Sequence, residues 1–135
     1  MIAECRLYSY HLRLTEPVLV RDCWLDARDG WLIQLISNQG HEGWGDIAPL
    51  PGYSLETSDE VLRQARLGCV FLEGGVFDEA HPAIHAMSPS VRFGFDSAHW
   101  MLGVSQREKK LVRQNALLTG STQACVDAAL RAVAR

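Results

Sequence analysis

Hydrophobic and polar residues alternate through the first third of the chain. Tyr8, Tyr10 and Leu12 fall on one side of an extended backbone, and the residues between them fall on the other. A period of two with aromatic residues predicts a half-buried strand over residues 5–14. The same period predicts strands over residues 31–36 and 41–48, with a turn at 37–40. Three consecutive strands with short connections favour an antiparallel meander.

Two segments of this region do not fit a strand pattern. Pro17 interrupts the first alternation, so residues 15–25 are expected to form a long connection. Asp29-Gly30 is a common turn dipeptide, and we expect a turn there before the second strand. Both expectations place breaks between the first and second strands.

Helical spacing replaces alternation after Pro51. Thr57 followed by Glu60 forms a capping box, and the apolar stripe that follows predicts a helix ending near residues 74–75. Residues 76–87 contain Pro82 and are expected to be irregular. Pro89 suits a first helical position, and apolar residues at helical spacing predict a second helix that ends at Gly103.

The last thirty residues predict a new unit. Residues 104–113 are charged and look like a linker, and a short apolar strand, a turn and an amphipathic helix follow within residues 114–135. Strand, turn and helix in this order open a parallel unit that needs further strands. We therefore expect one domain over residues 1–103 and the start of an incomplete second one. The uncovered apolar face of its helix predicts self-association through residues 114–135.

Composition and charge exclude several classes. The 135 residues are 47% hydrophobic and 21% charged, which is typical of a globular protein. The net charge is −3 and the sequence has no basic stripe, so no nucleic-acid partner is expected. No run is long and apolar enough for a membrane span, and no signal core opens the chain, so a cytoplasmic protein is expected. The four cysteines lie far apart and are expected to be reduced thiols.

Three motifs carry specific expectations. Gly43 and Gly45 share one side of a strand, where they allow another backbone to approach closely, while Asp46 is a candidate for ordering the loop that follows. His81 and His85 have the spacing of two zinc ligands, but Pro82 is expected to break their helix, so no metal site is predicted. Arg92 and Asp96 form an exposed i, i+4 pair with no functional role.

Two loops are candidate ligand-binding segments. Arg21 lies in the predicted connection between the first strands, where folding needs no charge, and residues 50–53 present apolar side chains at a backbone kink. Recognition usually resides on loops held by a rigid sheet. A solvated loop for Arg21 and simple loop packing for residues 50–53 remain open as structural explanations.

Several runs together resemble the o-succinylbenzoate synthase family, in particular the N-terminal capping domain of the proteobacterial form within the enolase superfamily. The runs are Tyr8-Ser9-Tyr10, Val20-Arg21-Asp22, Arg28-Asp29-Gly30, Gly43-Trp44-Gly45-Asp46-Ile47-Ala48-Pro49-Leu50-Pro51-Gly52-Tyr53-Ser54, Glu56-Thr57 and Pro89-Ser90-Val91-Arg92-Phe93-Gly94-Phe95. Asp46 stands where the family more often has glutamate, and Tyr53 where phenylalanine is common.

The resemblance implies an α+β cap, a three-stranded antiparallel meander followed by helices, with residues 114–135 as the first strand-helix unit of a truncated (β/α) barrel. It implies dehydration of 2-succinyl-6-hydroxy-2,4-cyclohexadiene-1-carboxylate to o-succinylbenzoate in menaquinone synthesis, with a lysine base and Mg²⁺ held by three acidic residues. It also places Arg21, Leu50, Pro51, Gly52 and Tyr53 on two loops that cover the carboxylate substrate.

The resemblance stops short of the chemistry. The only lysines are Lys109 and Lys110, and the sole acid beyond them is Asp127. A full barrel takes about 250 residues. We therefore expect no catalytic residue, no metal ligand and no bound Mg²⁺ in this chain, and an inactive isolated polypeptide. The alternatives are the cap of a muconate cycloisomerase or dipeptide epimerase, or a non-catalytic binding or dimerisation module.

Overall fold

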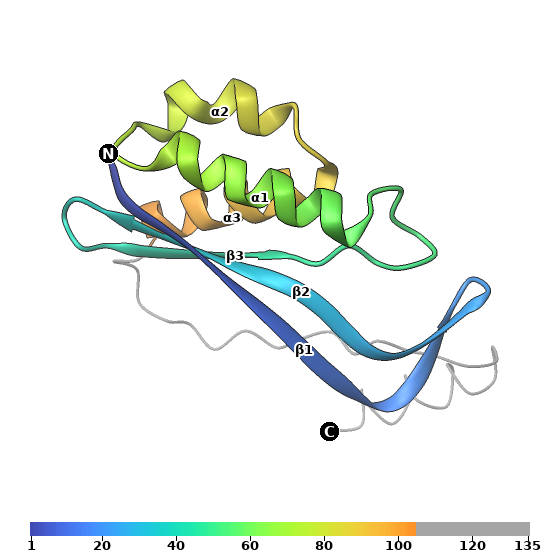
Figure 1. Ribbon diagram of the computed structural model, residues 1–135. Coiled ribbons are helices and arrows are strands. Elements are labelled where there is room, and N and C mark those ends of the chain that lie inside the picture. Colours follow the sequence, from blue (N-terminus) through green and yellow to red (C-terminus); the bar gives the residue numbers. More distant parts are fainter. Residues whose placement is uncertain (105–135) are drawn as a thin grey trace.

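The computed structural model describes residues 1–104 and consists of a three-stranded sheet with three helices on one face (Figure 1). The elements are β1 (Ile2–Val20), β2 (Cys23–Ser37), β3 (Glu42–Ile47), α1 (Ser58–Leu72), α2 (Phe77–His85) and α3 (Pro89–Val104). The strands lie in the order β1-β2-β3, and both pairs are antiparallel. This confirms the predicted meander followed by helices. The expected linker and the strand-helix unit of residues 114–135 lie outside the described residues.

β1 and β2 form a much longer hairpin than the sequence predicted. Residues expected to form a connection continue the ladder, with Val18 opposite Leu25 and Val20 opposite Cys23. Pro17 falls within a register shift between residues 13 and 18, where no ladder hydrogen bond requires its missing N–H. The predicted long connection was therefore wrong, and the turn is formed by residues 21 and 22 alone.

Asp29-Gly30 does not form the predicted turn either. Gly30 lies within β2 opposite Tyr10, and a Cβ atom at Gly30 would stand 2.3 Å from the Tyr10 hydroxyl. Asp29 lies opposite His11, with 2.6 Å between its Oδ1 and the ring Nδ1. Gly30 therefore makes room for the Tyr10 ring on the neighbouring strand. The Asp29-Gly30 dipeptide suggests a turn and gives no sign of this role.

The core lies between the sheet and the helices. Its largest fully buried side chains come from all of β2, β3, α1, α2 and α3: Phe95, Ile33, Leu35, Ile47, Leu72, Ile84, Val61 and Val91. α3 crosses β3 closely, because Cβ atoms at Gly43 and Gly45 would stand 2.0 Å from the Ala98 carbonyl oxygen and 1.8 Å from that of Gly94. This confirms the predicted role of the two glycines as sites of close backbone approach.

The sequence predicted where the helices begin better than how far helical structure extends. Thr57 caps α1, its hydroxyl accepting a hydrogen bond from the Glu60 N–H at 3.3 Å, while the Glu60 carboxylate accepts from Gln64 instead of completing the predicted box. The predicted irregular segment is wrong, since α2 runs through Pro82. Buried Phe77 and Ile84 hold the helix against the core, and that packing outweighs the local cost of the proline.

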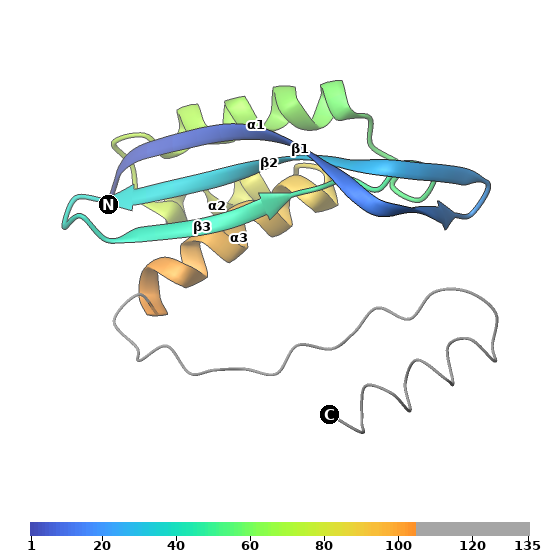
Figure 2. The same ribbon diagram turned by 90° about the horizontal axis from the view of Figure 1, so that it is seen from below.

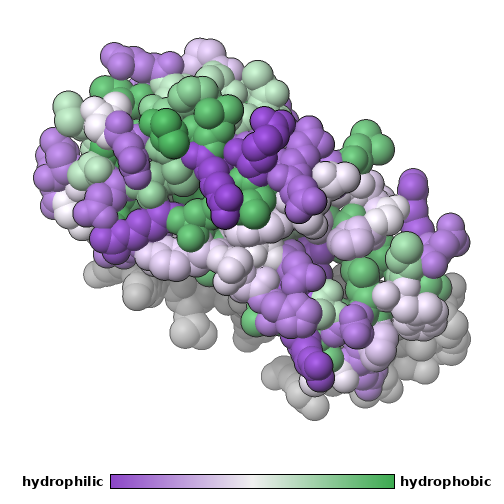
Figure 3. Space-filling model, viewed as in Figure 1, coloured by the Kyte–Doolittle hydropathy of each residue, from purple (hydrophilic) through white to green (hydrophobic). Residues whose placement is uncertain are grey.

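The described surface carries an apolar patch over the helical layer (Figure 3). On α1 the exposed apolar side chains include Leu67, Val70 and Phe71, of which Val70 is 68% exposed. None of the described helices is long and apolar enough to cross a membrane.

Candidate functional site: two loops at one end of the sheet

The two segments singled out from the sequence meet at the end of the long hairpin (Figure 1). The Arg21 guanidinium carbon lies 5.5 Å from the centre of the Tyr53 ring. Gly52 has a φ of 77°, and a Cβ atom there would stand 3.3 Å from Cys23 Sγ. We call residues 20–23 and 50–53 the loop pair. Segments about thirty positions apart in the sequence thus form one surface.

Arg21 occupies the tight turn of the hairpin. Its φ of 52° is the only positive value among the described residues other than glycine, and it lets two residues reverse the chain. The side chain is thereby held at the tip, where contact with the Tyr53 face orients the guanidinium without neutralising it. A guanidinium offers a planar fork of N–H donors that matches a carboxylate. Tyr53 is 67% exposed, so both groups are open to a ligand.

The base of the second loop is fixed by Arg28, which the sequence analysis did not single out. Its guanidinium donates hydrogen bonds to the carbonyl oxygens of Ala48 at 2.9 Å and Pro49 at 3.1 Å. The Leu50 N–H donates to Ser54 Oγ at 2.9 Å, and the Ser54 N–H returns a bond to the Leu50 carbonyl at 2.8 Å. The loop therefore has a rigid base beneath an exposed tip.

Asp46 does not order this loop, contrary to the expectation from its position. Its Oδ1 accepts a hydrogen bond from the Tyr10 hydroxyl at 2.8 Å, across the sheet. Partial burial and this bond to Asp46 raise the pKa of Tyr10 to about 12, so the phenol stays a donor at neutral pH. On the same face, Tyr8 stacks on Trp44 with ring centres 5.8 Å apart and donates to Gln34 at 2.9 Å. The segments that carry the family resemblance around Tyr8 and Trp44 thus form part of the sheet beside the loops.

Glu56 ties the far end of the same loop to α3. Its Oε1 accepts a hydrogen bond from the Ser90 N–H at 3.2 Å, in the first turn of that helix. Partial burial raises the pKa of the Glu56 carboxyl, but bonds from its own backbone N–H and from Ser90 outweigh burial and hold the pKa below its ordinary value. A negative charge is also favourable at a helix N-terminus.

We predict that Glu56→Gln lowers the stability of the chain at pH 7 and removes part of its acid sensitivity. The folded-state pKa is depressed, so the carboxylate contributes stability above its unfolded value of about 4.3, and that contribution disappears as pH falls through the folded pKa. Urea titrations between pH 7 and 3 measure this difference. Glu16→Gln, at an exposed position of β1, is the matched control and should follow the unmodified chain throughout. A constant gap between Glu56→Gln and the unmodified chain down to pH 3 would contradict the assignment.

The described residues bring together one group of three side chains suited to a metal, which consists of His81, His85 and Asp96. It lies on α2 and α3, away from the loop pair. No set of three carboxylates gathers among residues 1–104, so the Mg²⁺ ligands that the resemblance implies are not found in this part of the chain.

Comparisons with known proteins find relatives of this chain. The family model described as MenC, N-terminal domain, matches residues 2–102. The o-succinylbenzoate synthase of Aliivibrio salmonicida is 39% identical over 93 residues, covering 69% of this chain, and that of Edwardsiella ictaluri is 36% identical over 122 residues, covering 90%. The chain spans 27% and 36% of the lengths of these two relatives.

A solved structure extends the match to three dimensions. The o-succinylbenzoate synthase of Thermosynechococcus elongatus BP-1, complexed with Mg in its active site, aligns with 98% of this chain and 40% of its own. The TM-score is 0.75 and the sequence identity 28%.

Proposed function

We propose that this chain, which belongs to the MenC N-terminal domain family, is the substrate-covering cap of an o-succinylbenzoate synthase. The observation that carries the proposal is the meeting of Arg21 and Tyr53 on one exposed surface above a loop that Arg28 and Glu56 hold at both ends. A ligand-covering loop needs such a combination of an open tip and a fixed base.

The complete enzyme would remove water from 2-succinyl-6-hydroxy-2,4-cyclohexadiene-1-carboxylate to give o-succinylbenzoate. In that reaction, bound Mg²⁺ supplies positive charge where negative charge develops on the substrate carboxylate. The lysine base and the acidic ligands would come from a barrel, since Lys109 and Lys110 are adjacent and Asp127 is the only acid beyond them. We therefore expect no residue of this chain to abstract the proton or to hold the Mg²⁺.

The residues of the loop pair would bind and orient the substrate, and they would exclude water from the site. Arg21 would pair with one of the two carboxylates of the substrate, and Tyr53 would lie over its apolar part. Pro51 and Gly52 are exposed at the tip of the second loop and would lie over the ligand, and the positive φ of Gly52 supports the turn there. Excluding water strengthens every charge interaction in the closed site.

The direct test is a chimera. Residues 1–103 of this chain would be joined to the barrel of the Edwardsiella ictaluri enzyme, and o-succinylbenzoate formation followed with Mg²⁺ present. We expect turnover by the chimera and none by the 135-residue chain alone. Dehydration by the isolated chain would contradict the division of labour, and a folded chimera without turnover would contradict the cap assignment.

In that chimera we predict that Arg21→Gln lowers kcat/KM by about tenfold to a hundredfold, the worth of one charge-assisted hydrogen bond. The steady-state kinetics of Arg13→Gln provide the control, because Arg13 is an exposed cation on the same hairpin but away from its tip. Equal kinetics of the two variants would show that Arg21 does not contact the substrate.

A further inference from the structure

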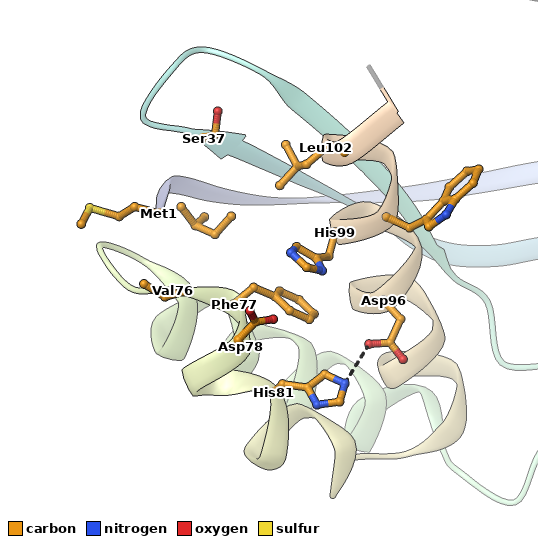
Figure 4. A pocket seen from close by; sticks show the side chains of 12 residues that line it. Met1, Ser37, Val76, Phe77, Asp78, His81, Asp96, His99 and Leu102 are labelled. Atoms are coloured by element: carbon orange, nitrogen blue, oxygen red, sulfur yellow. Dashed lines mark ion pairs between the residues drawn. The ribbon is translucent and has the colours of Figure 1, made fainter. Parts of the chain in front are cut away.

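Two histidines and an aspartate converge between α2 and α3, on elements that do not carry the loop pair. His81 and His85 lie one helical turn apart, with ring centres separated by 4.7 Å. Asp96 faces them from α3, and its Oδ1 is 3.7 Å from His81 Nε2 (Figure 4). The convergence depends on the continuation of α2 through Pro82, which the sequence analysis did not foresee.

The donor atoms are close to the spacing that a metal ion requires. One ligand atom from each of the three residues lies within 4.8 Å of the other two. Tetrahedral Zn²⁺ with bonds of about 2.0–2.1 Å holds its donors about 3.4 Å apart. The contraction needed is small for partly exposed side chains, since those of His81 and Asp96 are 42% and 41% exposed and can rotate without moving the helices.

The backbone that carries the three residues is well anchored. Phe77 and Ile84 of α2 are buried beneath the histidines, and Phe95 of α3, next to Asp96, is fully buried. The His99 ring stacks on Phe77 with 3.9 Å between ring centres, which braces the contact between the two helices. A cavity of about 790 Å³ opens beside His81, Asp96 and His99, and it leaves room for water to complete the coordination shell (Figure 4).

We propose that His81, His85 and Asp96 bind one divalent transition-metal ion of the Zn²⁺ class, which cross-links α2 to α3. Two imidazoles and one carboxylate favour Zn²⁺ or Co²⁺ over Mg²⁺, which prefers oxygen ligands. The site is separate from the proposed cap function and from the Mg²⁺ of the relatives' reaction. Its role is to stabilise the helical layer, because an ion that binds only the folded state shifts the folding equilibrium.

The test uses the untagged 135-residue chain and Zn²⁺ or Co²⁺ as the probe. We expect one equivalent to bind in calorimetric titration, and the midpoint of the thermal transition to rise by roughly 10 °C when free Zn²⁺ exceeds Kd about a hundredfold. The same concentration of Mg²⁺ should leave the midpoint unchanged. Bound Co²⁺ should show ligand-field bands without a thiolate charge-transfer band, which separates this site from binding by cysteines.

Variants at each ligand make the assignment specific. His85→Gln and Asp96→Asn should each weaken Zn²⁺ binding by more than about tenfold while the metal-free chains keep their fold, as judged by circular dichroism. His11→Gln removes an imidazole that pairs with Asp29 in the hairpin, and it should bind Zn²⁺ like the unmodified chain. Absence of Zn²⁺ binding, a thiolate band with Co²⁺, or undiminished affinity in both ligand variants would overturn the proposal.

Discussion

Gly45→Ala is expected to destabilise the domain by at least about 3 kcal/mol, with a fall of the thermal midpoint by about 15 °C. The new Cβ atom would stand 1.8 Å from the Gly94 carbonyl oxygen and 3.1 Å from the Ala98 nitrogen. Both neighbours are backbone atoms, so no side-chain rotation relieves the overlap. α3 would have to move away from β3 as a whole, and the contacts between them would loosen.

Gly103→Ala is the matched control for this substitution. A Cβ atom at Gly103 meets no atom of residues 1–104 within 4 Å, and the residue lies in the last turn of α3. Alanine is the better helix former, so this variant should range from unchanged to about 1 kcal/mol more stable. Guanidinium titrations of the two variants measure the difference. Similar stability of Gly45→Ala and the unmodified chain would show that α3 does not press on β3 as described.

Phe95→Ala should cost about 3–5 kcal/mol, the cost of emptying a fully buried aromatic site. The ring packs against Gly68 of α1, where an added Cβ atom would stand 2.5 Å from two ring carbons. Gly68→Ala alone should therefore also destabilise the domain, because the ring has no free space to occupy.

The two substitutions should compensate when they are combined. Removing the ring at position 95 removes the overlap, so Gly68→Ala in the Phe95→Ala background should be neutral or stabilising by up to about 1 kcal/mol. A double-mutant cycle from urea titrations measures this coupling. Additive effects of the two substitutions would contradict the direct packing of Phe95 on Gly68.

The local signals in the sequence located several elements correctly and for identifiable reasons. The alternation through Tyr8 and Tyr10 and the cap at Thr57 act over a few residues, and tertiary packing did not override them. The extension of β1 and the helix α2 escaped prediction because each contains a proline whose local cost the fold accommodates. Pro17 lies at a register shift, and buried Phe77 and Ile84 hold α2 in place around Pro82.

The candidate site was predictable only in its exposed parts. Arg21 and Tyr53 stand out in a loop because folding does not require them there, whereas the contact between them depends on the hairpin's full length. Arg28 was missed because its partners are the backbone carbonyls of Ala48 and Pro49, and no pattern of side chains encodes such a target. Asp96 was paired with Arg92 from spacing, but α2 brings His81 to it instead.

The length of the β1–β2 hairpin has a mechanical consequence. β3 ends at Ile47, opposite Trp31 of β2. From Gly30 to the turn at residues 21 and 22, the hairpin is therefore a ribbon of two strands, and it projects past the helical layer (Figure 2). A two-stranded ribbon twists and bends more readily than a three-stranded sheet, and the register shift near Pro17 is its natural flexing point. Arg28, opposite Leu12, lies on the sheet side of this shift, and Arg21 lies on the far side. Bending at the shift would therefore move the Arg21 cation toward or away from the Tyr53 ring, while Arg28 keeps the second loop in place.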